Sequence, residues 1–313
     1  MNLFNKPKKP QEQAIVIQQD RLHSFIESFI TTLDTKDITK IQYRKGLMYF
    51  EKWIAENNIA SPNRETILQY KTLLIEQQLK PLTISAYLVA IRRFFTYLES
   101  IKAYPNIARD IKGMKRPRGF FKDTLTKDQI ALLLPINKRK KSVTDLRDFA
   151  VMNLILRTGL RTIEVQRADI GDIGSDSGKT ILRIWRKNRD EKDDFVILTP
   201  EAYKPILDYL KARKNPDTTL PLFVSHSNNS IDSRLTTRSI RRIVDERLQA
   251  LGMKTERLSA HALRHTAATL ALQNGADIMQ VKDLLGHASV STTMIYTHNI
   301  NRIKEGAENF IKF

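Results

Sequence analysis

Apolar side chains recur at helical spacing through the first hundred residues. The first stripe repeats every three or four positions and consists of Leu22, Phe25, Ile26, Phe29, Ile30 and Leu33. Such spacing places all of them on one face of a helix. Two similar stripes cover residues 41–54 and 84–98. Between them, Ser61 as a cap and Pro62 at the first helical position predict a further helix start.

These patterns predict a four-helix domain over residues 19–105. The preceding residues 1–18 are rich in Lys, Gln and Pro and are expected to form a flexible arm. Residues 106–122 are predicted to be a basic linker, because 109–122 hold six basic residues, one acid, two glycines and one proline.

The remainder, residues 123–313, is predicted to be a mostly helical second domain with a small β-hairpin or sheet. The β-branched runs at 179–186 and 194–199 flank a polar stretch and predict the hairpin. Helices are expected near 126–135, 144–158, 161–168, 200–213, 236–251, 260–274, 277–285 and 289–297, with an amphipathic piece at 300–312. The fold class is therefore mainly α, in two domains.

Charge and cysteine content narrow the functions. The net charge of +18 indicates a polyanionic partner, nucleic acid or acidic membrane. No apolar run approaches the ~18 to 20 residues of a membrane span, and the polar start lacks the apolar core of a signal peptide, so an intracellular protein is expected. There are no cysteines and no clustered histidines, and we expect neither a metal nor another cofactor.

Arg161 lies where an anion can bind. Gly159 can end one helix in the left-handed conformation, which places Arg161 at the start of the next. A guanidinium forks onto two phosphate oxygens, and the helix N-terminus adds partial positive charge. Taken alone, Arg161 is better explained as a surface arginine with its charge in water.

Three further positions follow in order. His261 and Arg264 form the motif HALR and share one helix face. His287 follows in LLGHASV, and Tyr296 in TTMIYTH is the one tyrosine of nine that lies beyond HALR. Cutting DNA without a metal needs cations around the phosphate, a nucleophile, and an acid for the departing oxygen.

In this ordered set the sequence strongly resembles the tyrosine recombinase, or phage integrase, family, with a Xer-like plan. The resemblance covers about residues 19–313. It implies a core-binding domain and a catalytic domain that together form a C-shaped clamp on DNA. It also implies that Arg161 and Arg264 clamp the scissile phosphate, that His261 and His287 are their hydrogen-bonding partners, and that Tyr296 is the nucleophile.

The resemblance further implies a lysine on the hairpin as general acid. We assign Lys187, with Lys192 as the alternative, because Arg186 and Asn188 replace the glycines that often flank this lysine in the family and leave the register of the turn open. Glu164 matches an acidic position of the family that orients the site.

The implied reaction forms a 3′-phosphotyrosine, passes through a Holliday junction, and integrates, excises or resolves DNA without metal or ATP. Its expected partners are double-stranded recombination sites and three further protomers, in a homotetramer or a heterotetramer with a partner recombinase. The expected location is the cytoplasm, at the nucleoid. Residues 300–312 are expected to dock on a neighbouring protomer, or else to pack within their own domain.

Basic side chains outside the motif set are candidates for DNA contact, mainly with the backbone. They are Arg92, Arg93, Lys115, Arg116, Arg118, Arg238, Arg241 and Arg242. Three rival interpretations stay open: a type IB topoisomerase, a DNA-binding regulator without catalysis, and a basic helical protein that coats nucleic acid. Only the first uses the whole motif set, and an adduct formed by the wild type but not by a Tyr296→Phe protein that still binds DNA would exclude the other two.

Overall fold

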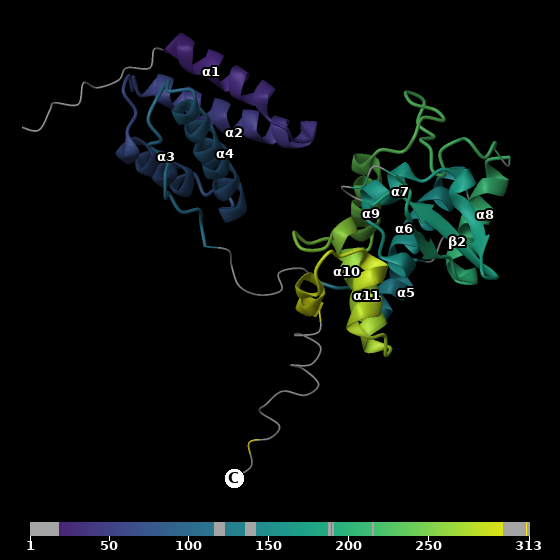
Figure 1. Cartoon of the computed structure of the whole chain (residues 1–313). Helices are drawn as coiled ribbons and strands as arrows, with labels where there is room; N and C mark the ends of the chain where they lie inside the picture. Colours follow the sequence, from purple (N-terminus) through teal and green to yellow (C-terminus); the bar gives the residue numbers. More distant parts are fainter. Residues whose placement is uncertain are drawn as a thin grey trace, which may run out of the picture. The chain divides into compact units, whose positions relative to one another are not determined.

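The structure of the chain is a computed structural model that describes residues 19–115, 123–134, 142–186, 189, 191–214, 216–296 and 311. The chain divides into two units, residues 1–118 and 119–313 (Figure 1). Each unit has a hydrophobic core of its own. The predicted fold class, mainly α with a small sheet, is confirmed.

The described part of the first unit contains the four helices that the sequence predicts. They are α1 (Gln19–Thr32), α2 (Asp37–Glu56), α3 (Arg64–Glu76) and α4 (Pro81–Ser100). The core between them is rich in aromatic rings; Phe50, for example, contacts Tyr70 edge-on with ring centroids 5.0 Å apart. Burying such rings supplies much of the stability of a small helical domain.

The predicted start of α3 is wrong by two residues. Asn63 is the cap, because its side chain accepts a hydrogen bond from the backbone N–H of Thr66 and the Thr66 hydroxyl oxygen accepts one from Asn63. Asn is among the best N-cap residues, and this reciprocal box satisfies two backbone donors at the start of α3.

Part of the predicted linker packs on the first unit. Ala108 and Ile111 are buried in the same core as α1 to α4, and the hydroxyl of Tyr104 donates to the carbonyl of Pro62 at 2.6 Å. Residues 116–122 of that linker lie outside the described residues, as do residues 1–18 of the predicted arm.

The second unit is built around α6. Its described elements are α5 (Lys127–Leu133), α6 (Val143–Thr158), α7 (Thr162–Arg167), the 3-10 turn η1 (Ile170–Asp172), β1 (Ile173–Asp176), β2 (Lys179–Ile184), β3 (Asp194–Ile197), α8 (Pro200–Ala212), α9 (Thr237–Ala250), α10 (Ala260–Gln273) and α11 (Ile278–Leu285), and residues 290–296 are also helical. α6 is buried on nearly all sides and packs against α8 and α10. The predicted protomer-exchange helix at 300–312 lies outside the described residues except for Ile311.

The sheet has three antiparallel strands in the order β1-β2-β3. The predicted hairpin is its β2–β3 pair, with Leu182 opposite Val196. β1 was not predicted. It pairs with β2 across Ser177 and Gly178, which both have positive φ as a tight two-residue hairpin turn requires.

Candidate active site

Helix ends converge to form the site. Gly159 ends α6 in the left-handed conformation at φ 65°, and Arg161 is the cap of α7, as predicted. A Cβ on Gly159 would lie 2.8 Å from Leu285 Cδ2, at the end of α11. The turn between α6 and α7 is therefore packed closely against the last residue of α11.

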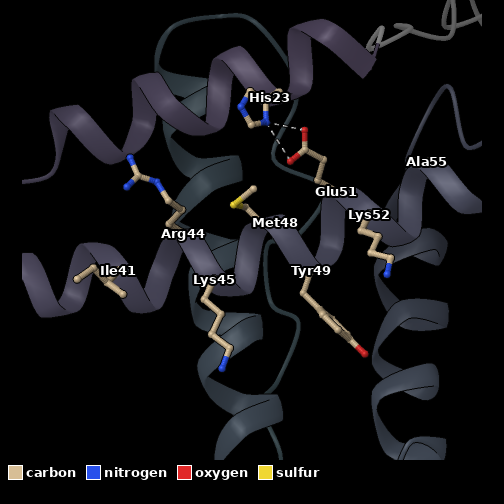
Figure 2. Close-up of a pocket in the computed structure, with 9 residues that line it drawn as sticks. All are labelled: His23, Ile41, Arg44, Lys45, Met48, Tyr49, Glu51, Lys52 and Ala55. Atoms are coloured by element: carbon tan, nitrogen blue, oxygen red, sulfur yellow. Dashed lines mark hydrogen bonds and ion pairs between the residues drawn. The ribbon is translucent and has the colours of Figure 1, made fainter.

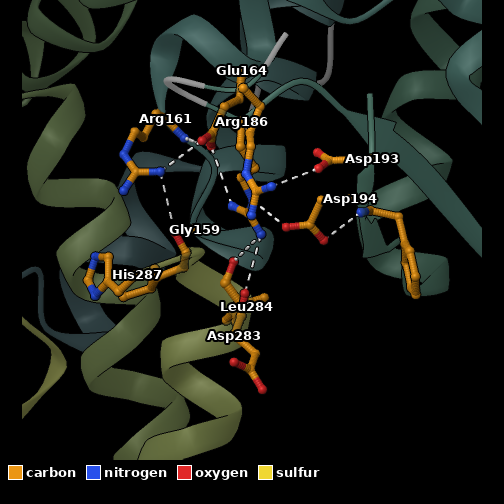
Figure 3. Close-up of polar contacts among 12 residues, drawn as sticks. Gly159, Arg161, Glu164, Arg186, Asp193, Asp194, Asp283, Leu284 and His287 are labelled. Carbon is orange, nitrogen blue, oxygen red and sulfur yellow. Dashed lines mark hydrogen bonds and ion pairs between the residues drawn. The ribbon is translucent and has the colours of Figure 1, made fainter. Parts of the chain in front are cut away.

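Glu164 lies at the centre of the cluster and is fully buried. Its Oε2 accepts from the backbone N–H of Arg161 at 2.8 Å, and its Oε1 accepts from Arg161 Nη1, also at 2.8 Å (Figure 3). Arg264 Nη1 is 3.9 Å from the same carboxylate. Glu164 thus holds both predicted phosphate-clamping arginines, consistent with the orienting role expected for it.

Arg264 is only 1% exposed. Its Nη1 donates to the carbonyl of Gly159 at 2.6 Å and its Nη2 donates to the carbonyl of Leu285 at 2.7 Å. Burial, followed by the charge of Arg161, lowers the pKa of Arg264 to about 10, with Glu164 opposing the shift. The guanidinium therefore stays charged at neutral pH in a site that already holds another cation.

His287 lies against Arg264, with its Nε2 3.1 Å from Arg264 Nη2. Because the guanidinium can only donate, Nε2 is the acceptor and the ring proton is on Nδ1, which donates to Thr293 Oγ1 at 2.9 Å. Burial, then the charges of Arg264, Arg161 and Arg186, lower the pKa of His287 to about 4. This histidine is neutral in the DNA-free protein.

Tyr296 is 4% exposed and packs on Ala268, Val281 and Leu285 of α10 and α11. Its hydroxyl oxygen is 2.5 Å from Nδ1 of His265. Burial raises the pKa of Tyr296, whereas the charges of Arg264 and Arg161 oppose the rise. The hydroxyl is therefore protonated at neutral pH and close enough to both arginines to respond to their charge.

His261, by contrast, lies at the exposed start of α10. Its ring stacks edge-on against His265 with centroids 4.6 Å apart. The structure thus brings Arg161, Arg264, His287 and Glu164 into direct contact, and connects Tyr296 and His261 to each other through His265.

Of the two candidate general acids, Lys187 and Lys192, the structure describes Lys192. Lys187 lies outside the described residues. Lys192 Nζ donates to Asp169 at 2.8 Å and to Asp172 at 2.7 Å. Burial acts to lower the pKa of Lys192, but these two hydrogen-bonded carboxylates outweigh it and raise the pKa. An amine held in this way is a poorer proton donor, which supports Lys187.

Sequence reasoning missed three residues of the site: Arg186, His265 and Thr293. Arg186 is a buried cation beside Glu164. His265 follows HALR and stands one helical turn after His261, a spacing that could have indicated it. Thr293 has no such signal, since its role depends on contact with His287.

The DNA-contact candidates differ in exposure. Arg238, Arg241 and Arg242 are exposed along α9, where Arg242 also pairs with Glu246 at 3.5 Å. On α4, Arg93 is exposed and Arg92 is partly buried, while Lys115 is exposed. Arg116 and Arg118 lie outside the described residues.

The first unit carries a cavity of about 860 Å³ between α1 and α2 (Figure 2). Its lining combines Met48 and Ile41 with Arg44 and Lys45, and His23 hydrogen-bonds Glu51 at its edge. It contains none of the predicted catalytic residues. Among the residues that the structure describes, no helix is long and apolar enough to cross a membrane, and no group of acidic and histidine side chains could hold a metal.

A four-helix unit followed by a helical unit in which two arginines share one buried glutamate, with a histidine against one of these arginines and a tyrosine within reach of their charges, is the plan of the tyrosine-dependent DNA strand transferases. The chain belongs to the phage integrase family. The family model matches residues 123–302, and that of the phage integrase N-terminal SAM-like domain matches residues 24–102.

Curated relatives are similar along most of their length. The chain is 30% identical over 290 residues to the tyrosine recombinase XerC of Herpetosiphon aurantiacus, covering 90% of this chain and 92% of that protein. It is 30% identical over 272 residues to the XerC of Pelobacter propionicus, covering 85% and 87%. The pre-cleavage complex of the XerH recombinase with difH substrate has the same fold, with a TM-score of 0.73, 20% identity, and coverage of 96% and 99%.

Proposed function

We propose that this chain is a site-specific DNA recombinase that cleaves and rejoins strands through a 3′-phosphotyrosine at Tyr296. One observation carries the proposal: Arg161 and Arg264 share the buried Glu164, and both charges act on the pKa of the Tyr296 hydroxyl. Two fixed guanidiniums beside a nucleophile suit a phosphodiester, whose charge grows on the non-bridging oxygens in the transition state.

The proposed reaction is a displacement at phosphorus. The Tyr296 oxygen attacks phosphorus, its O–P bond forms, and the bond from phosphorus to the 5′ oxygen breaks. Arg161 and Arg264 neutralise the non-bridging oxygens, with His261 and His287 as further hydrogen-bonding partners. Lys187 donates a proton to the departing 5′ oxygen, and the tyrosine proton leaves to a nearby base.

Rejoining reverses this step with the 5′ hydroxyl of a partner strand. Because one phosphodiester replaces another, the bond energy is conserved and no ATP is needed. The arginines supply the positive charge that a metal ion provides in other nucleases, so the proposed reaction is also metal-independent.

The proposed partners are double-stranded recombination sites bound by four protomers, either identical or shared with a partner recombinase, that exchange strands through a Holliday junction. The relatives named as recombinases, and the solved complex of XerH with its DNA substrate, support this part. The protein would then act in the cytoplasm, at the nucleoid.

Two other functions fit the same residues. A type IB topoisomerase would use the same chemistry without partner exchange, and a silent regulator would bind DNA without cutting it. The match to the N-terminal SAM-like domain of phage integrases and the XerC relatives favour the recombinase.

The test is to sequence DNA that remains covalently attached to the protein after denaturing purification from cells, comparing the wild type with Tyr296→Phe. Discrete sites that depend on Tyr296 are expected and would identify the recombination site. Scattered Tyr296-dependent sites would indicate a topoisomerase, and adducts that persist in Tyr296→Phe would refute the proposed nucleophile.

A further inference from the structure

A third guanidinium is buried in the cluster, at the end of the central strand. Arg186 lies two residues after the end of β2 and is only 5% exposed. Its Nε donates to Asp194 Oδ2 at 2.7 Å, and its Nη1 is 3.7 Å from Glu164 Oε2 (Figure 3). The side chain therefore joins the first residue of β3 to the carboxylate that holds both phosphate-clamping arginines.

The same side chain also holds the end of α11. Arg186 Nη2 donates to the carbonyls of Leu284 at 3.1 Å and Asp283 at 3.3 Å. These carbonyls lie at the negative end of the helix dipole, which favours a cation, and that of Asp283 also accepts from the backbone N–H of Gly286. The residues that follow are Gly286 and His287, so Arg186 anchors the segment that presents this histidine.

Gly286 allows this approach. A Cβ at this position would lie 2.6 Å from Arg186 Nε, and Gly286 caps α11 with φ 58°. The guanidinium thus lies directly against the backbone of the cap. Any side chain at Gly286 would push Arg186 away from its partners.

Burying Arg186 has a cost. It adds a third positive charge beside Arg161 and Arg264, opposed by the carboxylates of Glu164 and Asp194. An exposed arginine would avoid this repulsion and the loss of hydration. What the burial provides is a fixed end of β2, since the guanidinium contacts β3, α7 and α11 at once.

We infer that Arg186 is a positioning residue for the protonation of the leaving strand, and this inference rests on the proposed function. By fixing the end of β2 against Glu164 and the end of α11, it sets the point from which the chain continues, one peptide bond on, into Lys187. The proton moves from Lys187 Nζ to the 5′ oxygen as the bond to phosphorus breaks. Arg186 itself does not touch the DNA.

A sulfur-for-oxygen substitution in the substrate tests this role. In a duplex of the recovered recombination site, sulfur replaces the bridging 5′ oxygen at the scissile position. A thiol has a pKa near 8.5, so the sulfur departs as a thiolate and needs no proton. Such DNA still requires the nucleophile and the phosphate clamp, but not the general acid.

The measurement is single-turnover adduct formation on both substrates. Arg186→Ala is expected to cleave the oxygen substrate about 100-fold more slowly than the wild type, the loss typical of a misplaced catalytic group. Its rate on the sulfur substrate should be close to that of the wild type. Arg186→Lys should behave similarly, because a single ammonium cannot reach carboxylates and carbonyls on three elements together.

Arg189→Ala is the matched control. Arg189 lies in the same hairpin, is exposed and pairs only weakly with Asp193 at 3.1 Å, so its loss removes the same charge without the anchor. It should match the wild type on both substrates. Should Arg186→Ala fail to fold, Asp194→Ala removes one anchor contact and should show a smaller loss confined to the oxygen substrate.

An equal loss on both substrates would overturn the inference, because Arg186 would then support the phosphate clamp or the fold. Failure of the proposed function is a separate result. It would appear as adducts formed by Tyr296→Phe, or as a Lys187→Ala protein that the sulfur substrate does not rescue.

Discussion

At the scale of single residues, His287 shows how the cluster controls protonation. Its Nε2 faces the guanidinium of Arg264. Burial is the largest cause of its lowered pKa, and the charges of three arginines lower the pKa further. A bound phosphate adds negative charge next to these cations. DNA binding therefore offsets part of the depression, and His287 becomes a better hydrogen-bond donor only when substrate is present.

The depressed pKa predicts how stability depends on pH. An unfolded histidine titrates near 6.5, whereas His287 in the folded protein titrates at about 4. Between these values the unfolded chain binds more protons, so the contribution of His287 is complete above pH 6.5 and is lost as the pH falls towards 4.

Urea unfolding at pH 7 and pH 5 measures this effect. From pH 7 to pH 5 the wild type should lose more free energy of unfolding than His287→Gln does, by on the order of 1 kcal/mol, because water screens this partly buried ring. Identical losses in the two proteins would show that His287 is not neutralised by the cluster.

His265 provides a second prediction, since it is the histidine in contact with the nucleophile. Its Nδ1 lies 2.5 Å from the Tyr296 hydroxyl, within the reach that a proton acceptor needs. His265→Phe keeps an aromatic ring but removes the acceptor. We expect adduct formation at pH 7 to slow by about 100-fold or more, and to recover as the pH approaches that of tyrosine ionisation.

The pH–rate profile of adduct formation checks this expectation, with DNA affinity measured alongside it. A profile that His265→Phe leaves unchanged would assign the proton to another acceptor.

At the scale of elements, the site is an assembly of helix ends. The end of α6, the start of α7 and the end of α11 meet around Glu164, and Arg264 bonds to carbonyls at both helix ends. The hairpin that leads to Lys187 is held at its base in a similar way. Trp185 stacks under Arg167 with 4.8 Å from the guanidinium to the ring centroid, and Lys192 is held by Asp169 and Asp172.

Gly159 tests how tightly these ends are packed. Gly159→Ala and Gly252→Ala both place alanine at φ 65°, which costs roughly 1–2 kcal/mol in each case. A Cβ at Gly252 meets nothing within 4 Å, whereas at Gly159 it meets the fully buried Leu285. Gly159→Ala should therefore lose about 1–3 kcal/mol more than its control, as overpacked cores do.

Equilibrium unfolding of the two variants gives the comparison. Gly159→Ala should also form less adduct, because the carbonyl of Gly159 accepts from Arg264, while Gly252→Ala should keep its activity. Equal losses of stability would mean that Leu285 at the end of α11 can move away from the added Cβ at no cost in free energy.

How far the sequence predicts these elements depends on whether the signal is local. Three apolar stripes and the Ser61-Pro62 start signal predicted the four helices of the first unit, and Gly159 before Arg161 predicted the α6–α7 turn. β1 was missed because the short stretch from Ile173 to Asp176 has no alternating pattern, and it becomes a strand only by pairing with β2. Ser177-Gly178 was its one local signal.

The residues of the site also divide into those with a local sequence signal and those that depend on distant partners. Arg161, Arg264 and His287 stand in recognisable motifs, and the structure brings them together around Glu164, although their catalytic roles stay predictions. Arg186 could not be predicted as a member, because its partners come from β3, α7 and α11, up to 98 positions away in the sequence. Only the folded chain brings these groups together.

At the scale of the whole molecule, the net charge of +18 exceeds what the catalytic cluster needs. Part of the excess positive charge lies along α9, where Arg238, Arg241 and Arg242 are exposed. The other face of this helix carries the buried side chains of Ile240, Val244 and Leu248. That these arginines contact the DNA backbone stays a prediction. It follows from charge and exposure, and salt dependence can measure it.

Each side chain that binds a phosphate releases condensed counterions, so removing one such side chain changes the slope of log affinity against log salt by about 0.9. Arg238→Ala/Arg241→Ala should therefore reduce the slope by up to about 1.8 and weaken binding to specific and unrelated DNA alike. Fluorescence anisotropy over a range of salt concentrations gives both quantities.

The control must remove the same charge from another surface. Lys204 and Lys211 are exposed on α8, and their double alanine variant lowers the net charge equally. If the general field of the protein attracted DNA, both double variants would weaken binding to the same extent. A lower slope in the α9 variant alone would place the DNA backbone on that helix, because only direct binding of phosphates releases counterions in a countable number.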